Sequence, residues 1–415
     1  MATMLIISSE HLDSAGLQRR VNDLRHIDNR TNWYYLLREY VFLGLIVGLT
    51  LAFYHYRAGL GLSLIWCIPV TFVAVFIIGA CQHRLTTLGH EASHYMLFRN
   101  RWLNELVSDW FCMFPMLSNT HHYRIQHLAH HQYPNDPERD PDISQMEASG
   151  HRFDFPMSPR RFVWECVIKQ LLWLPSLIRY IRIRAKYSAT GSGGGPYESR
   201  GPRSKILVAV GITYLLTLAA ALTALTYLGN PWLLAVVPAA MLALILAFYA
   251  LVPARLYRQT LIRPVVSARW TTVGRMTYLT SLSTALAWLS HLTDKPWGLY
   301  YLVLWILPLV TSFSFFMIMR QVVQHGNADQ DRLTNTRIFH VGSLIRFAVF
   351  PLGMDYHLPH HLFPMVPHYS LRPLHRLLMA TDGYREQSTL VEGYFFPPET
   401  SPAHPTVLDV MAESK

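Results

Sequence analysis

The chain has 415 residues, of which 51% are apolar and only 15% are charged, and its formal net charge is +10. This composition excludes an ordinary soluble protein and makes a lipid bilayer the expected solvent for much of the chain. The basic residues lie between apolar runs rather than on one polar face, which argues against a nucleic-acid partner, and the 4 cysteines show neither CxxC pairs nor a disulfide framework.

Residues 1–39 are expected to form a polar segment on the cytoplasmic side of the membrane. They mix both charges and lack the pattern of a cleavable signal peptide, so the first apolar run should anchor the mature protein. We assign residues 40–380 to a membrane domain and residues 381–415 to a C-terminal tail.

Apolar runs long enough to cross a bilayer core, which takes about 20 residues, follow in three pairs. Each pair is joined by a short, turn-like connection, so we expect three helical hairpins with both termini on one side. The predicted spans are residues 40–56, 60–80, 206–228, 232–252, a weaker run at 276–292, and 297–319. The expected fold class is therefore an all-α integral membrane protein with about four to six transmembrane helices.

The segments between the predicted spans differ in length and composition, and they indicate how the chain is oriented in the membrane. Residues 101–116 and 162–181 are apolar but short or interrupted, so we expect re-entrant or interfacial helices there. The stretch 191–195 is glycine-rich and is expected to be a flexible linker rather than a phosphate loop. The long connections are rich in Lys and Arg and the short turns are not, which places the long connections in the cytoplasm.

Histidines gather in three clusters that have helical spacing. The clusters, at 90–94, 127–131 and 357–361, have the sequences His-Glu-Ala-Ser-His, His-Leu-Ala-His-His and His-Leu-Pro-His-His. Residues three and four apart share a helix face, so each cluster can present two or three imidazoles to one space. Pro359 fits a helix that begins near His357, because a proline in the first turn loses no hydrogen bond.

A metal site explains these clusters better than chance does. An isolated HxxxH is more often a pair of hydrogen-bonded or solvated histidines, but two HxxHH patterns among 21 histidines are rare. All clusters lie just beyond the second or sixth predicted span, on the cytoplasmic side. Eight or nine imidazoles exceed the four ligands of one zinc ion and suit two ions. Imidazole binds iron, copper and zinc alike, so zinc hydrolysis remains the alternative chemistry.

The three clusters, their order, and the two-hairpin insert between the second and third resemble the membrane fatty-acid desaturase and hydroxylase superfamily. The segments 127–131 and 356–364 look most like those of bacterial acyl-lipid desaturase-like proteins, and the likeness covers about residues 89–375. Two departures leave the subfamily open. The first cluster has three intervening residues where many acyl desaturases have four, and Pro359 replaces a residue that is often polar.

The resemblance implies a non-haem centre with two iron ions per chain in a cytoplasmic helical cap, and no catalytic residue beyond the metal ligands. The ligands that it implies are His90, His94, His127, His130, His131, His325, His357, His360 and His361. By the same likeness, the amide of Gln321 would hold a metal-bound water. Residues expected either to orient the ligand imidazoles or to be structural are Glu91, His122, Asp140 and Asp355.

The expected reaction uses O2 and two electrons to remove hydrogen from an unactivated carbon of a fatty acid or acyl lipid. The lipid chain would enter through an apolar tunnel, for which Phe313, Phe315, Phe316 and Met317 are candidates, although helix packing is the favoured role for each. Arg320 is expected either to snorkel to the interface or to gate the site.

The sequence contains no haem domain or iron–sulfur ligands, so electrons would come from a ferredoxin or a cytochrome b5 type protein with its reductase, docked on basic loops. Two alternative functions remain. A lipid or carotenoid hydroxylase or ketolase of the same superfamily would differ only in its product. A histidine-rich metal transporter is disfavoured, because the spans contain almost no ionisable groups that could form a pathway.

Overall fold

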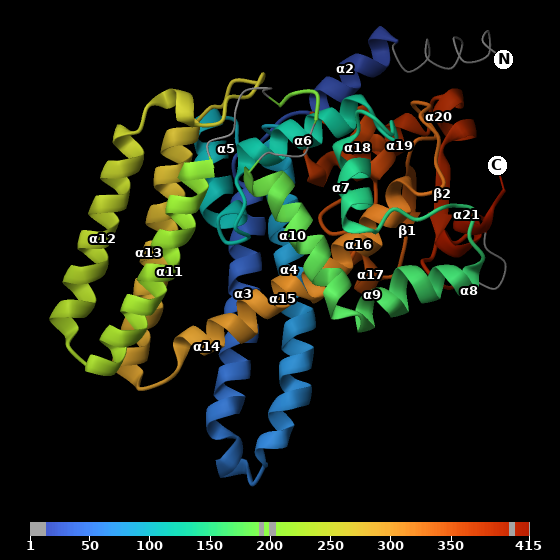
Figure 1. Ribbon diagram of the computed structural model, residues 1–415. Helices are drawn as coiled ribbons and strands as arrows, with labels where there is room; N and C mark the ends of the chain where they lie inside the picture. The colour runs from blue at the N-terminus through green and yellow to red at the C-terminus, as the bar shows by residue number, and fades with distance from the viewer. Residues whose placement is uncertain (1–13, 191–194, 199–204, 398–402, 415) are drawn as a thin grey trace.

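The computed structural model describes residues 14–190, 195–198, 205–397 and 403–414 and is dominated by helices (Figure 1). The helices are α2 (Ala15–Leu24), α3 (Thr31–Tyr56), α4 (Cys67–Ser93), α5 (Arg101–Ser108), α6 (Thr120–Gln132), α7 (Pro141–Ser149), α8 (Pro159–Phe162), α9 (Lys169–Leu172), α10 (Leu174–Thr190), α11 (Lys205–Leu228), α12 (Pro231–Leu251), α13 (Ala268–Thr293), α14 (Trp297–Tyr301), α15 (Leu307–Val310), α16 (Ser312–His325), α17 (Ser343–Ala348), α18 (His357–Leu362), α19 (Leu371–Leu378), α20 (Asp382–Gln387) and α21 (Val407–Ala412). Except for Gly195, the predicted linker at 191–195 lies outside the described residues.

Five helical segments in the described part of the chain are long and apolar enough to cross a membrane. They cover residues 31–60, 64–93, 205–228, 231–251 and 297–325, which confirms the membrane fold class. The weaker run at 276–292 is not among them, although it lies in α13, which packs beside α11 and α12 as one bundle (Figure 1). Helix α4 continues through Ser93, so the first histidine cluster extends from the second span without a break.

The last predicted span is not one straight helix. A π-helical stretch, Leu302–Ile306, separates α14 from α15, and the backbone then breaks at Thr311, with φ −103° and ψ −90°. Pro308 in α15 has no N–H to donate, which weakens the helix at this place. Helices α14 and α15 consequently run obliquely to α3 and α4 (Figure 1).

After this break, α16 packs closely against α4. The Ser312 hydroxyl donates to the Val75 carbonyl over 2.6 Å. A Cβ atom at Gly79 would lie only 2.1 Å from Ser312 Oγ, so only glycine permits this approach. The contact carries α16 beside the first histidine cluster and brings His325, at the end of α16, towards it.

The segment 162–181 forms the end of α8, a π-helical stretch Val163–Ile168, α9 and the start of α10. The helical run breaks at Trp173, where φ is −101° and ψ is 81°. Trp164 and Trp173 are both exposed, as the interfacial interpretation requires, because tryptophan favours the headgroup region.

Residues after 380, which we set apart as a tail, pack back against the domain. Strand β2 (Thr389–Glu392) pairs in parallel with β1 (Arg337–His340), with Arg337 opposite Thr389. Helix α21 packs against α8, and the Met157 amide donates to the Met411 carbonyl over 2.8 Å. The pairing of β2 with β1 holds the segment that leads from α16 to the third histidine cluster.

Candidate metal centre

The nine histidines singled out in the sequence form two adjacent groups. The five-histidine group consists of His90, His94, His127, His131 and His360. The four-histidine group consists of His130, His325, His357 and His361. Within each group, one ring nitrogen from every residue lies within 4.8 Å of the others, and every residue is buried or half-buried. The centroids of the His131 and His361 rings, one from each group, lie 4.3 Å apart, so the groups share a wall.

Two short helices each contribute to both groups. In α6, His127 and His131 are about one turn apart and join the five-histidine group, whereas His130 joins the four-histidine group. In α18 the assignment is reversed, because the first and last histidines join the four-histidine group and His360 joins the other. The HxxHH spacing therefore supplies two imidazoles to one group and one to its neighbour.

Imidazole nitrogens of the five-histidine group converge on one point. Nε2 of His131 lies 3.0 Å from Nε2 of His127 and 3.0 Å from Nε2 of His360. The Nε2 atoms of His90 and His94 are buried and have no hydrogen-bond partner. Buried polar atoms of this kind normally have a partner, so their orientation needs an explanation.

The four-histidine group shows the same convergence. Nε2 of His357 lies 3.1 Å from Nε2 of His325 and 3.2 Å from Nε2 of His361. Nitrogen ligands at about 2.0–2.1 Å from one metal ion are separated by about 2.9–3.4 Å in tetrahedral or octahedral geometry. Both groups therefore fit a metal ion, and imidazole is a ligand that iron, copper and zinc accept.

Burial keeps most of these imidazoles neutral, which is the form that binds a metal. It lowers the pKa of His94 to about 3 and the pKa values of His127 and His131 well below the usual value. At His130, burial is outweighed by the Asp140 and Asp142 carboxylates, which raise the pKa to about 9. At neutral pH this pKa leaves His130 protonated on both nitrogens, so a metal ion would have to displace the proton on Nε2, while the Asp140 carboxylate holds the proton on Nδ1.

Hydrogen bonds to the second ring nitrogen orient some of the histidines. His130 Nδ1 lies 3.0 Å from both carboxylate oxygens of Asp140, which also accepts the amide of Asp142 and so caps α7. His325 Nδ1 lies 3.0 Å from the Asn335 carbonyl. Contacts of this kind fix the tautomer and the ring plane of a ligand histidine.

Comparison with known proteins identifies the family to which this chain belongs. The model of a family described as fatty acid desaturase matches residues 71–256 and 249–390, which include all three clusters. The chain belongs to the fatty acid desaturase family. It is therefore an oxidoreductase of the desaturase type.

Two relatives carry desaturase names. The chain is 24% identical over 336 residues to dihydrorhizobitoxine desaturase of Bradyrhizobium elkanii, a match that covers 80% of this chain and 73% of the relative. It is 25% identical over 114 residues to the sn-1 oleoyl-lipid 12-desaturase of a Picosynechococcus species, covering 28% of this chain and 32% of that relative. The two names refer to different substrates, so the likeness leaves the substrate of this desaturase open.

Glu91 and Gln321, which were also expected near the centre of this desaturase, each contact residues beside it. Glu91 Oε1 is 3.4 Å from His90 Nδ1, and its Oε2 accepts the amide of His368. The amide of Gln321 accepts the Tyr180 hydroxyl and lies 3.5 Å from Asp142.

His122 and Asp355 belong to neither histidine group. Nδ1 of His122 lies 2.8 Å from the Asn119 amide. Asp355 is buried, its backbone carbonyl accepts the Phe339 amide, and burial raises its pKa to about 6.

A fully buried arginine that was not predicted from the sequence joins the first two clusters. Arg124 in α6 forms two hydrogen bonds with the Glu105 carboxylate, at 2.9 and 2.6 Å. It also donates to the carbonyls of Ala92 and Ser93, at the end of α4. Arg124 therefore ties the helix of the first cluster to the helix of the second. The available signal was Glu105, an acid within a short apolar segment, which we interpreted only as an interruption.

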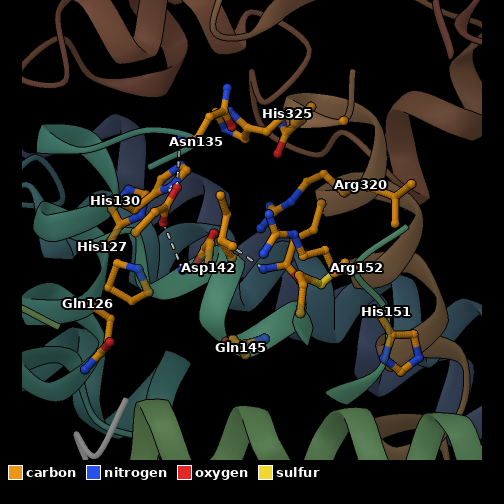
Figure 2. Close-up of a pocket in the computed structure, with 18 of the residues that line it drawn as sticks. Gln126, His127, His130, Asn135, Asp142, Gln145, His151, Arg152, Arg320 and His325 are labelled. Carbon is orange, nitrogen blue, oxygen red and sulfur yellow. Dashed lines mark hydrogen bonds and ion pairs between the residues drawn. The ribbon is translucent and has the colours of Figure 1, made fainter. Parts of the chain in front are cut away.

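A cavity of about 270 Å³ opens beside the centre (Figure 2). Five of the nine histidines line it, namely His90, His127, His130, His325 and His357. The rest of its wall mixes polar side chains with apolar ones such as Phe153, Phe155 and Met354, and none of the four candidate tunnel residues lines it. Phe315, Phe316 and Met317 pack in the core, and Phe313 lines a second, smaller cavity of about 60 Å³.

Proposed function

We propose that this protein is a membrane-bound, O2-dependent desaturase of a fatty acid or acyl lipid that uses two iron ions held by the nine histidines. The observation that carries the proposal is the pair of adjacent buried groups, with five and four convergent imidazoles. Family membership supplies the reaction class. An all-imidazole shell suits a redox metal, and two groups of this size suit two ions.

The overall reaction converts a CH2–CH2 unit, O2, two electrons and two protons into a CH=CH unit and two water molecules. Iron would supply the activation of O2. The protein would hold the ligands and keep bulk water away from the buried groups. Asp140 would keep the proton of His130 on Nδ1, which orients Nε2 towards the metal.

The two electrons would come from a separate protein, because the four cysteines are free, three of them buried, and form no cluster site. A ferredoxin or a cytochrome b5 type protein with its reductase has the required chemistry. We place the histidine centre on the cytoplasmic side, since α10 and its neighbouring connections are basic. An acidic electron donor would dock on that surface.

A hydroxylase or ketolase would use the same centre and differ in its product, because oxygen would be retained on the carbon. The choice depends on how the substrate carbon lies relative to the metals. A metal transporter is the alternative of another class. Against it stand the family membership and the position of the histidines, which lie beyond the most apolar parts of the spans.

The decisive experiment compares cells that express the wild type with cells that express a His130→Ala, His131→Ala double variant. Fatty acids and lipids are profiled by mass spectrometry, and iron is measured in the purified proteins. His404→Ala is the matched control, because His404 is exposed and lies in neither histidine group.

We expect an unsaturated species with the wild type and the control only, and about two irons per chain in both. An oxygenated product would move the assignment to the hydroxylase. A wild type that binds no iron and gives the same profile as the double variant would overturn the proposal.

A further inference from the structure

The wall of the larger cavity contains hydrogen-bond donors that have no acceptor. They are Nε and Nη1 of Arg320 and Nε2 of Gln145. Both side chains line the cavity, and they are only 8% and 5% exposed. In Figure 2, Arg320 lies across the view from His127 and His130, with Asp142 drawn between them.

A buried arginine without an acceptor is unusual, because a guanidinium only donates hydrogen bonds and is rarely buried unless paired. The acids of the cavity do not supply the missing acceptor. Asp140 is bonded to His130, and Asp142 is 3.5 Å from the Gln321 amide. Arg152 and Arg184 also line the cavity, and Arg152 is paired with the Glu147 carboxylate over 3.5 Å. The unpaired donors of Arg320 therefore favour an anion.

The second cavity provides a contrasting environment next to the first. Its wall is mostly apolar and includes Met113, Leu309 and Phe313. The two cavities share Tyr123, Arg184 and Ser188 in their linings, so they adjoin. Together they offer a chamber of mixed polarity with a cationic donor and a narrow apolar one, which suits a molecule with an anionic end and an apolar part.

We propose that the larger cavity binds the anionic end of the substrate, a carboxylate or phosphate, with Arg320 as its anchor. The planar guanidinium suits either oxyanion, because it can donate two parallel hydrogen bonds. This inference rests on the proposed desaturase function and names the substrate class of the same site.

The position of the reacting bond follows from the size of the cavity. Arg320 and five of the ligand histidines line one space of about 270 Å³. That volume lies just below the range of about 300–1,000 Å³ that is typical of small-molecule pockets. The anionic group and the reacting carbon must share it, so the desaturated bond lies close to the anionic end. The apolar remainder of the substrate extends towards Leu309 and Phe313.

Binding to the purified, iron-loaded protein in detergent tests this inference. The probes are octanoate, its neutral methyl ester, and phosphatidylglycerol, and the readout is the thermal unfolding temperature as a function of probe concentration. The variant is Arg320→Gln. Arg161→Gln is the control, because Arg161 is exposed and lines neither cavity.

We expect the wild type and the control to bind octanoate at least about tenfold more tightly than the ester, and Arg320→Gln to lose that preference. Tighter binding of phosphatidylglycerol than of octanoate, again dependent on Arg320, would identify a lipid headgroup as the source of the anion. The absence of any preference for an anion in the wild type would overturn the inference, as would a preference that survives Arg320→Gln.

Iron content separates this inference from the proposed function. Arg320 is not among the histidine ligands, so Arg320→Gln should keep about two irons per chain while losing the anion. A wild type without iron would contradict the di-iron function itself. An iron-loaded wild type that binds acid and ester equally would contradict the anion site alone.

Discussion

The two histidine groups are held in different ways. In the four-histidine group, two of the rings are fixed through Nδ1, His130 by Asp140 and His325 by the Asn335 carbonyl. Nδ1 of His357 in that group has no hydrogen-bond partner, and the same holds for Nδ1 of His90, His131 and His360 in the five-histidine group. Packing and the Arg124 contacts between α4 and α6 position that group instead. Individual hydrogen bonds thus hold two rings of the smaller group, and the larger group depends more on the helices that carry it.

Removal of one ligand from each group should have the largest effect and should separate the groups. His357→Ala leaves three imidazoles in its group, whereas His94→Ala leaves four, which is still a complete set for a metal ion. We expect His357→Ala to retain about one iron per chain and to lose at least about a hundredfold of the activity, and His94→Ala to retain more iron. Metal analysis measures the iron content of each variant, and the rate of product formation measures its activity. Greater iron loss in His94→Ala would contradict the comparison.

The Arg124 contacts can be broken without touching a ligand. Arg124→Met leaves the buried Glu105 carboxylate unpaired, which should lower the free energy of unfolding by about 3–5 kcal/mol. Denaturant unfolding in detergent measures the change. Because Arg124 joins α4 to α6, iron should be lost first from the five-histidine group.

A second substitution controls this prediction. Glu105→Leu added to Arg124→Met removes the buried charge, so much of the lost stability should return. If the double variant were less stable than Arg124→Met, the unpaired carboxylate would not be the cause.

Asp140 provides the corresponding test in the four-histidine group. Asp140→Asn weakens the hydrogen bond to His130 Nδ1, and such changes reduce metal affinity by about 10–100-fold. A competition titration with a chelator should therefore show one weakened site out of two. Glu147→Gln on the same helix is the control, because Glu147 is exposed. Unchanged affinity at both sites would show that this hydrogen bond does not support the group.

Gln321 should give the smallest effect. Its amide bonds to the Tyr180 hydroxyl and lies near Asp142, so Gln321→Met should cost about 1 kcal/mol of stability and less than about tenfold in activity. Tyr180→Phe removes the same hydrogen bond from the other side and should behave similarly. A large fall in kcat for Gln321→Met alone, with stability unchanged, would instead indicate that the amide acts on a group at the metals.

Local signals predicted much of the fold and most of the centre. Five of the six apolar runs predicted as spans are confirmed as helices able to cross a bilayer, because length and hydropathy decide this property. The third cluster begins its helix at His357 with Pro359 in the first turn, as expected, because a proline loses nothing there. The histidine spacing indicated shared helix faces, and the structure brings all nine residues together.

Features that depend on long-range packing could not be predicted from the sequence. The break at Thr311 arises where α16 docks on α4 through Ser312 and Gly79, a contact between distant segments. Arg124 and Glu105 are unremarkable singly and acquire their role only as a buried pair. The buried position of Arg320 in the wall of the larger cavity could not be predicted for the same reason, since an arginine on an apolar helix was equally compatible with snorkelling to the membrane surface.

The division of α6 and α18 between both histidine groups has a consequence for how the protein acquires its metals. Neither helix can take its final rotation for one ion without also placing a ligand for the other. In the wild type, where both ligand sets are intact, occupancy of one position should therefore raise the affinity of the second, so that half-loaded wild-type molecules are scarce at equilibrium. Metal uptake by this protein is expected to be cooperative, with a steep dependence on the concentration of free metal.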